Sequence, residues 1–246
     1  AVSILFDIPS DLQKTYAFTA GQYVTVRTEV NNETIRRAYS ICSSEKSGDL
    51  RIAIKAIKNG VFSNHAFQSL NLGDSLDVTP PEGTFKLNTD NKALKNYLGF
   101  AAGSGITPIL SMIKTVLENE PKSTFTLVYG NKSNQETIFK EELDALTQKF
   151  IARLNIKYVF SQEEIKGAEF GRIDKATVHS IVREKFNHLD FDEAFLCGPE
   201  KMIQTVSTSL TENGFLKEKI HFELFFSSTN TEEISNHEGV SEITVV

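Results

Sequence analysis

The sequence contains little cysteine, and this scarcity narrows the classes of site that the chain can hold. Cys42 and Cys197 are the only cysteines among 246 residues and stand far apart. Two thiols can supply neither a disulfide framework nor a four-cysteine zinc or iron–sulfur site, and we expect no metal site. Such a composition is typical of the reducing cytoplasm, which is the location we expect. On packing grounds alone, each cysteine is predicted to be a small buried apolar residue.

Long apolar runs and an excess of basic charge are also absent. No stretch approaches the roughly 20 apolar residues that a membrane-spanning helix needs, and the N-terminus lacks the features of a signal peptide. The net charge is −6, and no basic patch with interleaved aromatic residues is found. We therefore expect neither a membrane nor a nucleic acid as a partner. The length allows two modest domains.

The first third of the chain has the pattern of short β-strands. Turn residues separate apolar, β-branched segments at 23–30, 35–43, 49–57 and 74–81. Only residues 61–70, VFSNHAFQSL, have a helical pattern. Strands this short and closely spaced predict an antiparallel β-barrel or sandwich over residues 1–88.

The pattern changes after residues 86–96, KLNTDNKALKN, which are polar and predict a linker. From there the expected strands are 96–103, 124–131, 154–161, 192–198 and 220–226. The expected helices between them are 107–119, 136–150, 174–186 and 199–214. This alternation predicts a doubly wound α/β domain over residues 89–226, in which helices cover both faces of a parallel sheet. Residues 227–246 are expected to be a linker and the possible first strand of a further domain, because that strand has no expected partner.

Three junctions between an expected strand and a helix carry residues suited to nucleotide binding. In GFAAGSGITPIL, Gly103 and Gly105 allow a close approach of backbone to phosphate, and the helix start at Thr107 offers unpaired N–H groups. One of the other two junctions holds Tyr129, Gly130, Asn131 and Lys132, and the other holds Cys197, Gly198 and Pro199. The carboxyl ends of parallel strands share one edge, where ligands bind. Taken alone, the glycine pattern lacks a third glycine, and a plain tight turn explains it equally well.

The segment RRAYSICSS, residues 36–44, presents a guanidinium, an aromatic ring and a hydroxyl side by side. It is followed by Gly-Ser-Gly-Ile-Thr-Pro at 103–108 and Cys-Gly-Pro at 197–199. In this order and spacing, the chain resembles the ferredoxin–NADP reductase family from its N-terminus to about Phe226. The resemblance implies a β-barrel that binds FAD, an α/β domain that binds the nicotinamide nucleotide, and an NAD(P)H-dependent flavoprotein reductase.

The resemblance also implies roles for residues of the barrel. Arg37 would neutralise the flavin pyrophosphate, Tyr39 would stack on the isoalloxazine ring, and Ser40 would hydrogen-bond near the flavin N5. Further flavin-binding residues would be Ala38, Lys55, Ala56, Ile57, Gly60, Val61, Phe62 and Ser63, the last four through N–H groups at a short helix start. Without the other motifs, a paired strand arginine, a core tyrosine and a strand serine would be the more ordinary explanations.

In the second domain, Gly103, Gly105 and Thr107 would surround the pyrophosphate of the nucleotide. Cys197, followed by Gly198 and Pro199, would lie beside the nicotinamide as a neutral thiol. In FELFF, Glu223 and Phe225 would bring a carboxylate and an aromatic ring near the flavin, although a buried strand with one exposed glutamate is an equal alternative. The predicted catalytic residues are Ser40, Cys197 and Glu223.

The nucleotide and the electron acceptor are less strongly indicated. Asn131 and Lys132 follow the second strand where NAD sites commonly place an acid, which favours NADPH over NADH; a solvated loop lysine is an equal explanation. RRAYSICSS, GVFSNHAF and IHFELFF resemble the reductases of phenylacetyl-CoA epoxidase systems, which carry a [2Fe–2S] domain after the flavin–nucleotide core. The C-x4-C-x2-C ligands of that cluster are absent here.

We therefore expect a ferredoxin-like domain or protein and an oxygenase as partners, in the degradation of phenylacetate or a related aromatic compound. Two alternatives stay open. The chain could be a stand-alone NAD(P)H reductase of flavin or another small acceptor, or a non-catalytic nucleotide-binding subunit.

Overall fold

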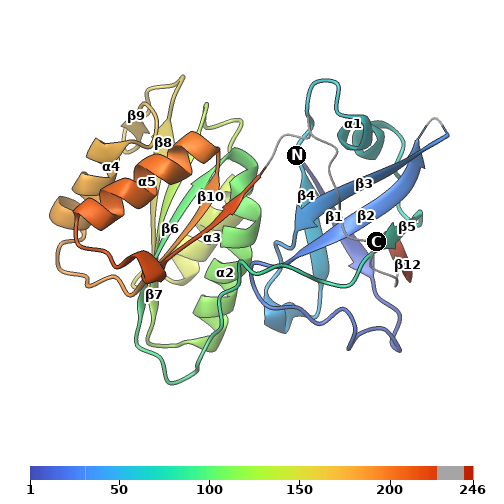
Figure 1. Cartoon of the computed structure of the whole chain (residues 1–246), viewed down its shortest axis with the longest axis horizontal. Coiled ribbons are helices and arrows are strands. Elements are labelled where there is room, and N and C mark those ends of the chain that lie inside the picture. Colours follow the sequence, from blue (N-terminus) through green and yellow to red (C-terminus); the bar gives the residue numbers. More distant parts are fainter. Residues whose placement is uncertain (31, 226–240, 246) are drawn as a thin grey trace. The chain divides into compact units, whose positions relative to one another are not determined.

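The computed structural model describes residues 1–30 and 32–225 and the backbone of 241–245. The chain divides into two compact units (Figure 1). The first contains residues 1–88, 110–114 and 226–246, and the second contains 89–109 and 115–225. Among the described residues, no helix has the length and apolar character needed to cross a membrane.

The first unit contains an antiparallel β-barrel, as the sequence predicts. Its strands run in the order β3-β2-β5-β12-β1-β4. Their bounds are Val2–Asp7 (β1), Tyr23–Val30 (β2), Glu33–Ser40 (β3), Leu50–Ile54 (β4), Ser75–Val78 (β5) and Ser241–Val245 (β12). The outer strands meet through a bridge between Ile41 and Ile52, and the Cys42 N–H donates to the Arg51 carbonyl at 2.8 Å. These contacts close the barrel.

Apolar residues fill the barrel with the period of two that a strand imposes. On β1, Ile4 and Phe6 are buried. Helix α1, Val61–Gln68, adds Phe62 and Ala66 to the same core. These two residues are four positions apart and so share one face of the helix, which anchors α1 to the barrel.

Two strands of the barrel differ from expectation. The sequence patterns do not predict β1, and they predict no partner for the last strand. Instead, β12 pairs with β5 and β1, with Ile243 opposite Leu76 and Val245 opposite Phe6. The expectation of an unpaired strand was therefore wrong. The physical reason is that β5 and β1 each pair elsewhere on one side only, with β2 and β4, so their other edges offer unpaired backbone groups.

The assignment of residues 227–246 to a connection with a further domain stays a prediction. Residues 226–240 lie outside the part of the chain that the structure describes.

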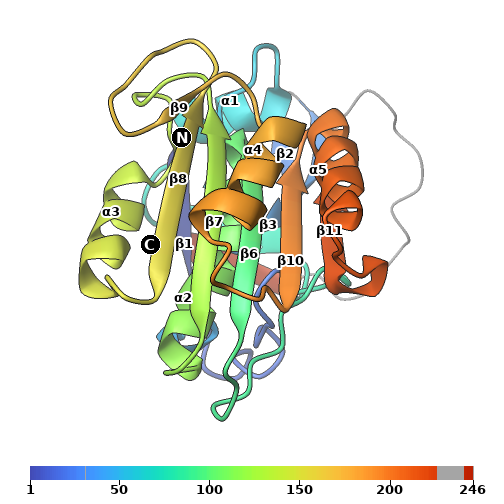
Figure 2. The same ribbon diagram turned by 90° about the vertical axis from the view of Figure 1, so that its left-hand side faces the viewer.

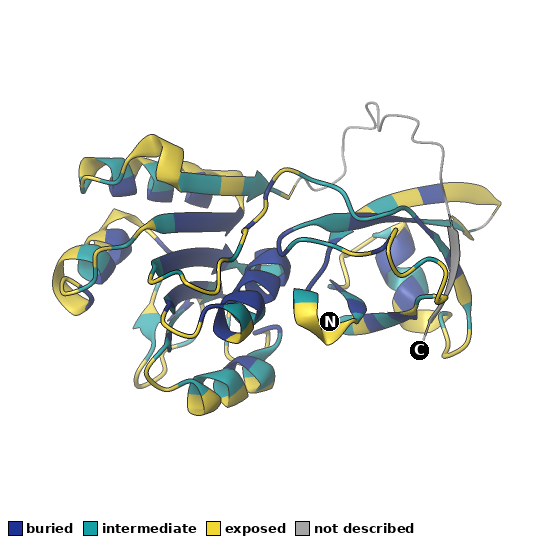
Figure 3. Ribbon diagram, turned by 90° about the horizontal axis from the view of Figure 1, so that it is seen from below, coloured by how far each residue is buried: buried dark blue, intermediate teal, exposed yellow. Residues whose placement is uncertain are grey.

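The second unit contains the predicted parallel sheet, with strand order β11-β10-β6-β7-β8-β9 (Figure 2). The strands are Asn96–Ala102 (β6), Thr124–Asn131 (β7), Leu154–Phe160 (β8), Glu169–Phe170 (β9), Glu193–Gly198 (β10) and Ile220–Leu224 (β11). Every neighbouring pair is parallel. The central strands are buried along most of their length (Figure 3), which explains why they read as apolar runs rather than alternating patterns.

Helices cover both faces of this sheet. They are Ile106–Asn119 (α2), Lys140–Lys149 (α3), Lys175–His179 (α4) and Glu200–Glu212 (α5). Helices α4 and α5 share a core with Val128 of β7 and Leu196 of β10. Helices α2 and α3 lie on the other face (Figure 1).

Local geometry shortens two of the expected helices. The helix expected over 136–150 begins only at Lys140, because Phe139 has φ 60°, outside the helical region. The helix expected over 174–186 ends at His179 and continues as a wider π-type turn over Ser180–Lys185. Strand β9, with two residues, is too short to leave a pattern in the sequence.

The boundary between the two units lies in the linker, between residues 88 and 89, and a hydrogen bond holds the chain on each side of it. Leu87 N–H donates to the Ala20 carbonyl at 3.0 Å, within the first unit. Asp90 N–H donates to a carboxylate oxygen of Glu120 at 2.9 Å, within the second unit. The fully buried Glu120 also accepts from the Tyr97 hydroxyl at 3.1 Å. The linker is thus tied down at both ends.

A charged cluster joins the amino-terminal ends of three strands of the parallel sheet. Lys95 Nζ lies 2.7 Å from Glu193 Oε1, and His221 Nε2 lies 3.2 Å from Glu193 Oε2. The hydrogen bond from His221 is the main cause that lowers the pKa of Glu193 from 4.5 to about 2; Lys95 adds to it, and burial opposes it. The carboxylate form is therefore the one that the fold stabilises.

This arrangement predicts that the wild-type protein loses stability in acid, and that the Glu193→Gln variant is less sensitive to acid. The folded pKa lies below the unfolded one, so the contribution is complete above about pH 4.5 and is lost as the pH falls towards 2. We expect the variant to lose on the order of 2 kcal/mol at pH 7 and to show a flatter decline below pH 4.5. Urea unfolding from pH 7 to pH 3 measures both effects. Glu164→Gln, at an exposed position, is the control, and parallel curves for wild type and Glu193→Gln would contradict the prediction.

Candidate flavin and nucleotide sites

Strand β3 places the predicted flavin-binding residues next to helix α1. Arg37 and Tyr39 are two positions apart and so share one face of the strand, while Ala38 and Ser40 lie on the other. The Tyr39 ring lies 5.6 Å from the ring of Phe62 on α1, measured between centroids. Burial raises the pKa of the Tyr39 hydroxyl to about 12, against an opposing effect of the Arg37 charge. The ring is thus half-buried in its own unit and keeps its proton.

The guanidinium of Arg37 is available for a ligand. Among the described residues, its one hydrogen bond goes to the carbonyl of the preceding Arg36, at 2.6 Å, and it forms no ion pair. A strand arginine paired with an acid, the ordinary alternative, is therefore not what the structure contains. An unpaired guanidinium beside an aromatic ring suits a phosphate ester attached to a ring system.

The turn into α1 is shaped by Gly60. A Cβ at this position would lie 2.4 Å from Ser63 Oγ and 3.2 Å from the Ile57 carbonyl oxygen. Ser63 Oγ accepts from the Ile57 N–H and donates to the Gly60 carbonyl, both at 3.3 Å, which closes the turn. The N–H groups of the first helical turn, from Val61 to Ser63, have no partner within the helix. The Gly60 N–H, which we predicted to bind the pyrophosphate, instead donates to the Ile57 carbonyl at 2.9 Å. The prediction for the pyrophosphate therefore stays with the N–H groups of Val61 to Ser63, and the prediction for the flavin ring with Lys55, Ala56 and Ile57 in the loop after β4.

In the second unit, the junction that holds Gly103 and Gly105 touches the junction that holds Cys197. Gly103–Gly105 forms a single 3-10 turn that leads into α2, and Cys197 stands near the end of β10. A Cβ on Gly105 would lie 2.2 Å from the Cys197 carbonyl oxygen and 2.9 Å from the Gly198 nitrogen. Glycine is needed at position 105 because backbone fills the space of a side chain. The two motifs therefore form one cradle at the carboxyl edge, as predicted.

Thr107 and Pro199 help to build this cradle. The Thr107 hydroxyl donates to the Ser104 carbonyl at 3.0 Å and is buried, so its side chain fixes the turn from inside. Pro199 is the N-cap residue of α5, and its carbonyl accepts from the Met202 N–H at 2.9 Å. Proline costs little there, since an N–H at a helix start has no partner within the helix.

Cys197 and Glu223 lie directly opposite each other on neighbouring strands. Cys197 is fully buried, and burial is the main cause that raises the pKa of its thiol, with the nearby Glu223 charge adding to it. The thiol is thus neutral near pH 7, as expected from the sequence. Phe225 follows β11 directly and is 38% exposed.

Asn131 ends β7 at the same edge and is 9% exposed. Its Nδ2 is buried and makes no hydrogen bond of normal geometry among the described residues, although the amide lies near enough to the Tyr129 hydroxyl to lower the pKa of that group. Lys132 follows it at the surface. A buried amide N–H without a partner is rare and suits a ligand oxygen.

Sequence reasoning placed Tyr129 at this edge without predicting a contact for it, and it did not find Arg172. The fully buried Tyr129 donates its hydroxyl to the Gly103 carbonyl at 2.9 Å, so it contacts the glycine turn from a neighbouring strand. Arg172 is exposed two residues after β9 and forms no ion pair or hydrogen bond within the described part of the chain. The order of the strands would have been needed to predict the Tyr129 contact or to find Arg172.

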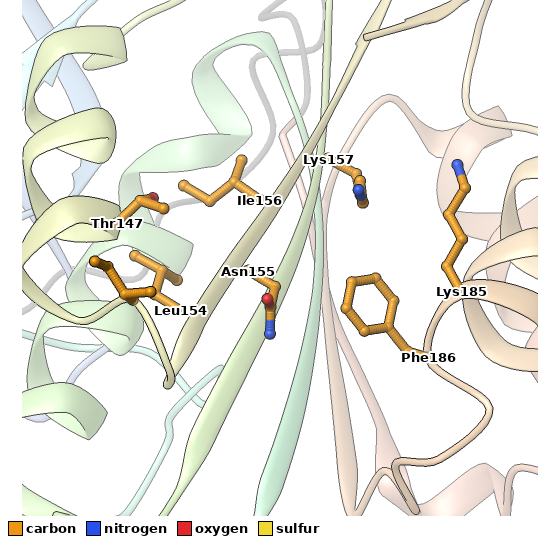
Figure 4. Close-up of a pocket in the computed structure, with 8 residues that line it drawn as sticks. Thr147, Leu154, Asn155, Ile156, Lys157, Lys185 and Phe186 are labelled. Carbon is orange, nitrogen blue, oxygen red and sulfur yellow. The ribbon is translucent and has the colours of Figure 1, made fainter. Parts of the chain in front are cut away.

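A separate hollow of about 550 Å³ lies beside the start of β8. Figure 4 shows Thr147 and Ile156 on one side of the strand, and Lys157 and Phe186 on the other. None of the predicted site residues lines it. In the described residues, no three His, Cys, Asp or Glu side chains gather as metal ligands would. The predicted site residues thus form two groups, one in each unit.

Comparisons with known proteins agree with these two groups. Residues 3–87 match the oxidoreductase FAD-binding domain, and residues 100–208 match the oxidoreductase NAD-binding domain. The chain is 40% identical over 226 residues to one subunit of 1,2-phenylacetyl-CoA epoxidase of Escherichia coli (strain K12), covering 92% of this chain and 64% of that protein. It is 31% identical over 252 residues to the ferredoxin reductase component of 3-ketosteroid-9-alpha-monooxygenase of Rhodococcus rhodochrous, covering 99% and 68%. The chain thus spans about two thirds of the length of these relatives.

Solved structures share the fold. The flavohem-like FAD/NAD-binding domain of nitric oxide dioxygenase from Vibrio cholerae has a TM-score of 0.76 at 23% identity, over 92% of this chain and 93% of that one. A ferredoxin NADP+ reductase from Neisseria gonorrhoeae, solved with FAD and NADP, has a TM-score of 0.75 at 21% identity, over 91% and 92%. Together with the two domain matches and the likeness to the Rhodococcus protein, these findings establish that the chain belongs to the ferredoxin–NADP reductase family and is an NAD(P)H-dependent flavoprotein reductase that uses FAD.

Proposed function

We propose that this reductase passes electrons singly to a [2Fe–2S] centre that supplies an oxygenase, in the degradation of phenylacetate or a related aromatic compound. The observation that carries the proposal is the 40% identity to a subunit of phenylacetyl-CoA epoxidase over nearly the whole chain. The second relative is the reductase component of a monooxygenase. A subunit of an epoxidase and the reductase component of a monooxygenase are thus both similar to this chain.

The [2Fe–2S] centre would belong to a ferredoxin-like domain or a separate protein. The two cysteines of this chain cannot ligate such a cluster, because both are buried and lie in different units. FAD, when bound, accepts a hydride as an electron pair and can release the two electrons one at a time. That property would connect a two-electron donor to a one-electron acceptor.

Residues of the barrel would hold and orient FAD. Arg37 would pair with the pyrophosphate, together with N–H groups of the first turn of α1. The Tyr39 ring would pack against the isoalloxazine, supported by its contact with Phe62. Ser40 is buried at the end of the same strand and would orient the ring by a hydrogen bond.

Residues of the parallel sheet would hold the nucleotide. Backbone N–H groups of the Gly103–Gly105 turn would bind its pyrophosphate, and the buried Nδ2 of Asn131 would donate to a ligand oxygen. The thiol of Cys197 would contact the nicotinamide and help to orient it. It would not act as a nucleophile, because the thiol is neutral and a nucleophilic cysteine must be activated to the thiolate. Glu223, opposite Cys197, would place a carboxylate at this edge.

We further propose that NADPH is preferred over NADH. Lys132 and Arg172 are exposed cations at the carboxyl edge, and neither forms an ion pair within the described residues. Strand register supports their proximity: Asn131 is opposite Phe160, which is opposite Phe170. Two cations near the ends of neighbouring strands suit the 2′-phosphate, which NADH lacks.

Anaerobic reduction of the purified protein tests this function. We expect a yellow protein whose visible flavin absorbance bleaches on mixing with NADPH, and more slowly at equal NADH. A protein that stays colourless after incubation with FAD would contradict the proposal. Faster bleaching by NADH would overturn the nucleotide preference alone.

The acceptor is tested with reduced protein and three oxidants. A plant-type [2Fe–2S] ferredoxin, free FMN and dioxygen are each added, and reoxidation is followed by absorbance. We expect the ferredoxin to be the fastest acceptor. Equal or faster transfer to FMN or dioxygen would favour a stand-alone reductase, and absence of reduction by either nucleotide would favour a non-catalytic subunit.

A further inference from the structure

The Tyr129 hydroxyl fixes one peptide group of the nucleotide cradle. It lies 2.9 Å from the Gly103 carbonyl oxygen and 3.4 Å from the Ile138 carbonyl oxygen. The same Gly103 carbonyl accepts from the Ile106 N–H at the start of α2. Gly103 has φ 55°, with open space where a Cβ would stand, so neighbouring side chains do not constrain the turn at this residue. The hydroxyl of Tyr129 supplies a constraint from outside the turn.

Fixing this carbonyl also fixes the N–H that follows it. A trans peptide group is planar, so the Gly103 C=O and the Ser104 N–H point in opposite directions. Ser104 stands in the first turn, where N–H groups have no partner within the helix. With the carbonyl held by Tyr129, the Ser104 N–H is held pointing away from Tyr129.

The donor is also rigid and constant in charge. Tyr129 is fully buried, and its ring packs against Tyr158, opposite it on β8, with centroids 6.3 Å apart. Burial raises the pKa of the Tyr129 hydroxyl well above its usual range, against the lowering effects of Asn131 and the Ile138 backbone, so the group keeps its proton near pH 7.

We propose that Tyr129 is a positioning residue for the nucleotide: by holding the Gly103 carbonyl, it orients the Ser104 N–H towards the pyrophosphate. The inference depends on the nucleotide site proposed above. Tyr129 does not touch the ligand. It acts by removing a rotation of the 103–104 peptide that binding would otherwise have to restrict.

Tyr129→Phe tests this role, with Tyr158→Phe as the matched control. Both variants keep their rings, but the Tyr158 hydroxyl donates to Asp144 of α3, at 3.2 Å, and not to the turn. The FAD-loaded proteins are titrated with 2′-phospho-ADP-ribose, which contains the pyrophosphate, and with 2′-AMP, which lacks it. We expect Tyr129→Phe to weaken the first ligand about tenfold and the second less than about twofold. In stopped-flow reduction, the NADPH concentration for half-maximal rate should rise more than the limiting rate falls.

The outcomes separate the inference from the proposed function. Equal weakening of both ligands, or an equal effect in Tyr158→Phe, would mean that the hydroxyl only stabilises the fold and would overturn the inference. Unchanged affinity for 2′-phospho-ADP-ribose would overturn it as well. If the wild-type protein bound neither ligand and was not reduced, the proposed nucleotide site itself would fail, and the inference with it.

Discussion

Gly105→Ala is expected to abolish most nucleotide oxidation while leaving FAD binding intact. The added Cβ would meet the Cys197 carbonyl oxygen at 2.2 Å and its carbonyl carbon at 2.5 Å. Both atoms are backbone, so no side chain can rotate away. The start of α2 and the end of β10 must separate, which misplaces the turn and the thiol together. We expect flavin reduction by NADPH to slow by about 100-fold or more, since misplacement by about 1 Å has effects of this size.

Stopped-flow reduction and thermal unfolding measure the result. Stability should fall by on the order of 2 kcal/mol, as in other overpacked cores. Gly73→Ala is the control, because it carries the strain of φ 91° in open space at a position outside both sites. Similar slowing in Gly105→Ala and Gly73→Ala would show that the clash with β10 is not the cause.

Loss of flavin is the expected result of Arg37→Ala and of Tyr39→Ala. The first variant removes a charge-assisted hydrogen bond to phosphate, and the second removes an aromatic surface for the isoalloxazine. Either change should weaken FAD binding by about 10- to 100-fold. If the two contacts are independent, the FAD affinity of the double variant should fall by close to the product of the two single-variant factors. Absorbance of the dialysed proteins and titration of the apoproteins with FAD give these affinities.

Two variants serve as controls for these substitutions. Arg36→Ala removes an equal charge one position away, where the side chain is exposed and on the other face of β3. Tyr39→Phe keeps the ring and loses only the hydroxyl. Both should retain FAD nearly as well as the wild type. Full flavin occupancy in Arg37→Ala and Tyr39→Ala after dialysis would mean that the flavin lies elsewhere.

The class of fold and the cradle follow from local patterns in the sequence. Apolar runs of strand length, each followed by an amphipathic helix, indicate a parallel sheet, and a parallel sheet brings its carboxyl ends together. This reasoning placed Gly105 and Cys197 at one edge, where the structure puts them in backbone contact. The antiparallel strands of the first unit were predictable from short β-branched segments separated by turns, and the resemblance to the family favoured a barrel over a sandwich.

Contacts that depend on strand order could not be predicted. The Tyr129 hydroxyl reaches the Gly103 carbonyl from a neighbouring strand, and the sequence around Tyr129 does not indicate which strand lies beside it. Unusual backbone conformations could not be predicted either. Phe139 has a positive φ, although phenylalanine rarely adopts one and the sequence gives no sign of it. The pairing of β12 was missed because the sequence does not reveal that β1 is a strand with a free edge.

The burial of both native thiols makes the protein suitable for site-specific dye labelling. Cys42 and Cys197 are each 0% exposed, so maleimide reagents should modify them far more slowly than an exposed cysteine while the protein is folded and saturated with nucleotide. A new cysteine at Leu72 in the first unit and another at Ile151 in the second would stand at sites that are 83% and 78% exposed. A donor and acceptor dye at these two positions would report the separation of the units during turnover, with no need to remove a native cysteine.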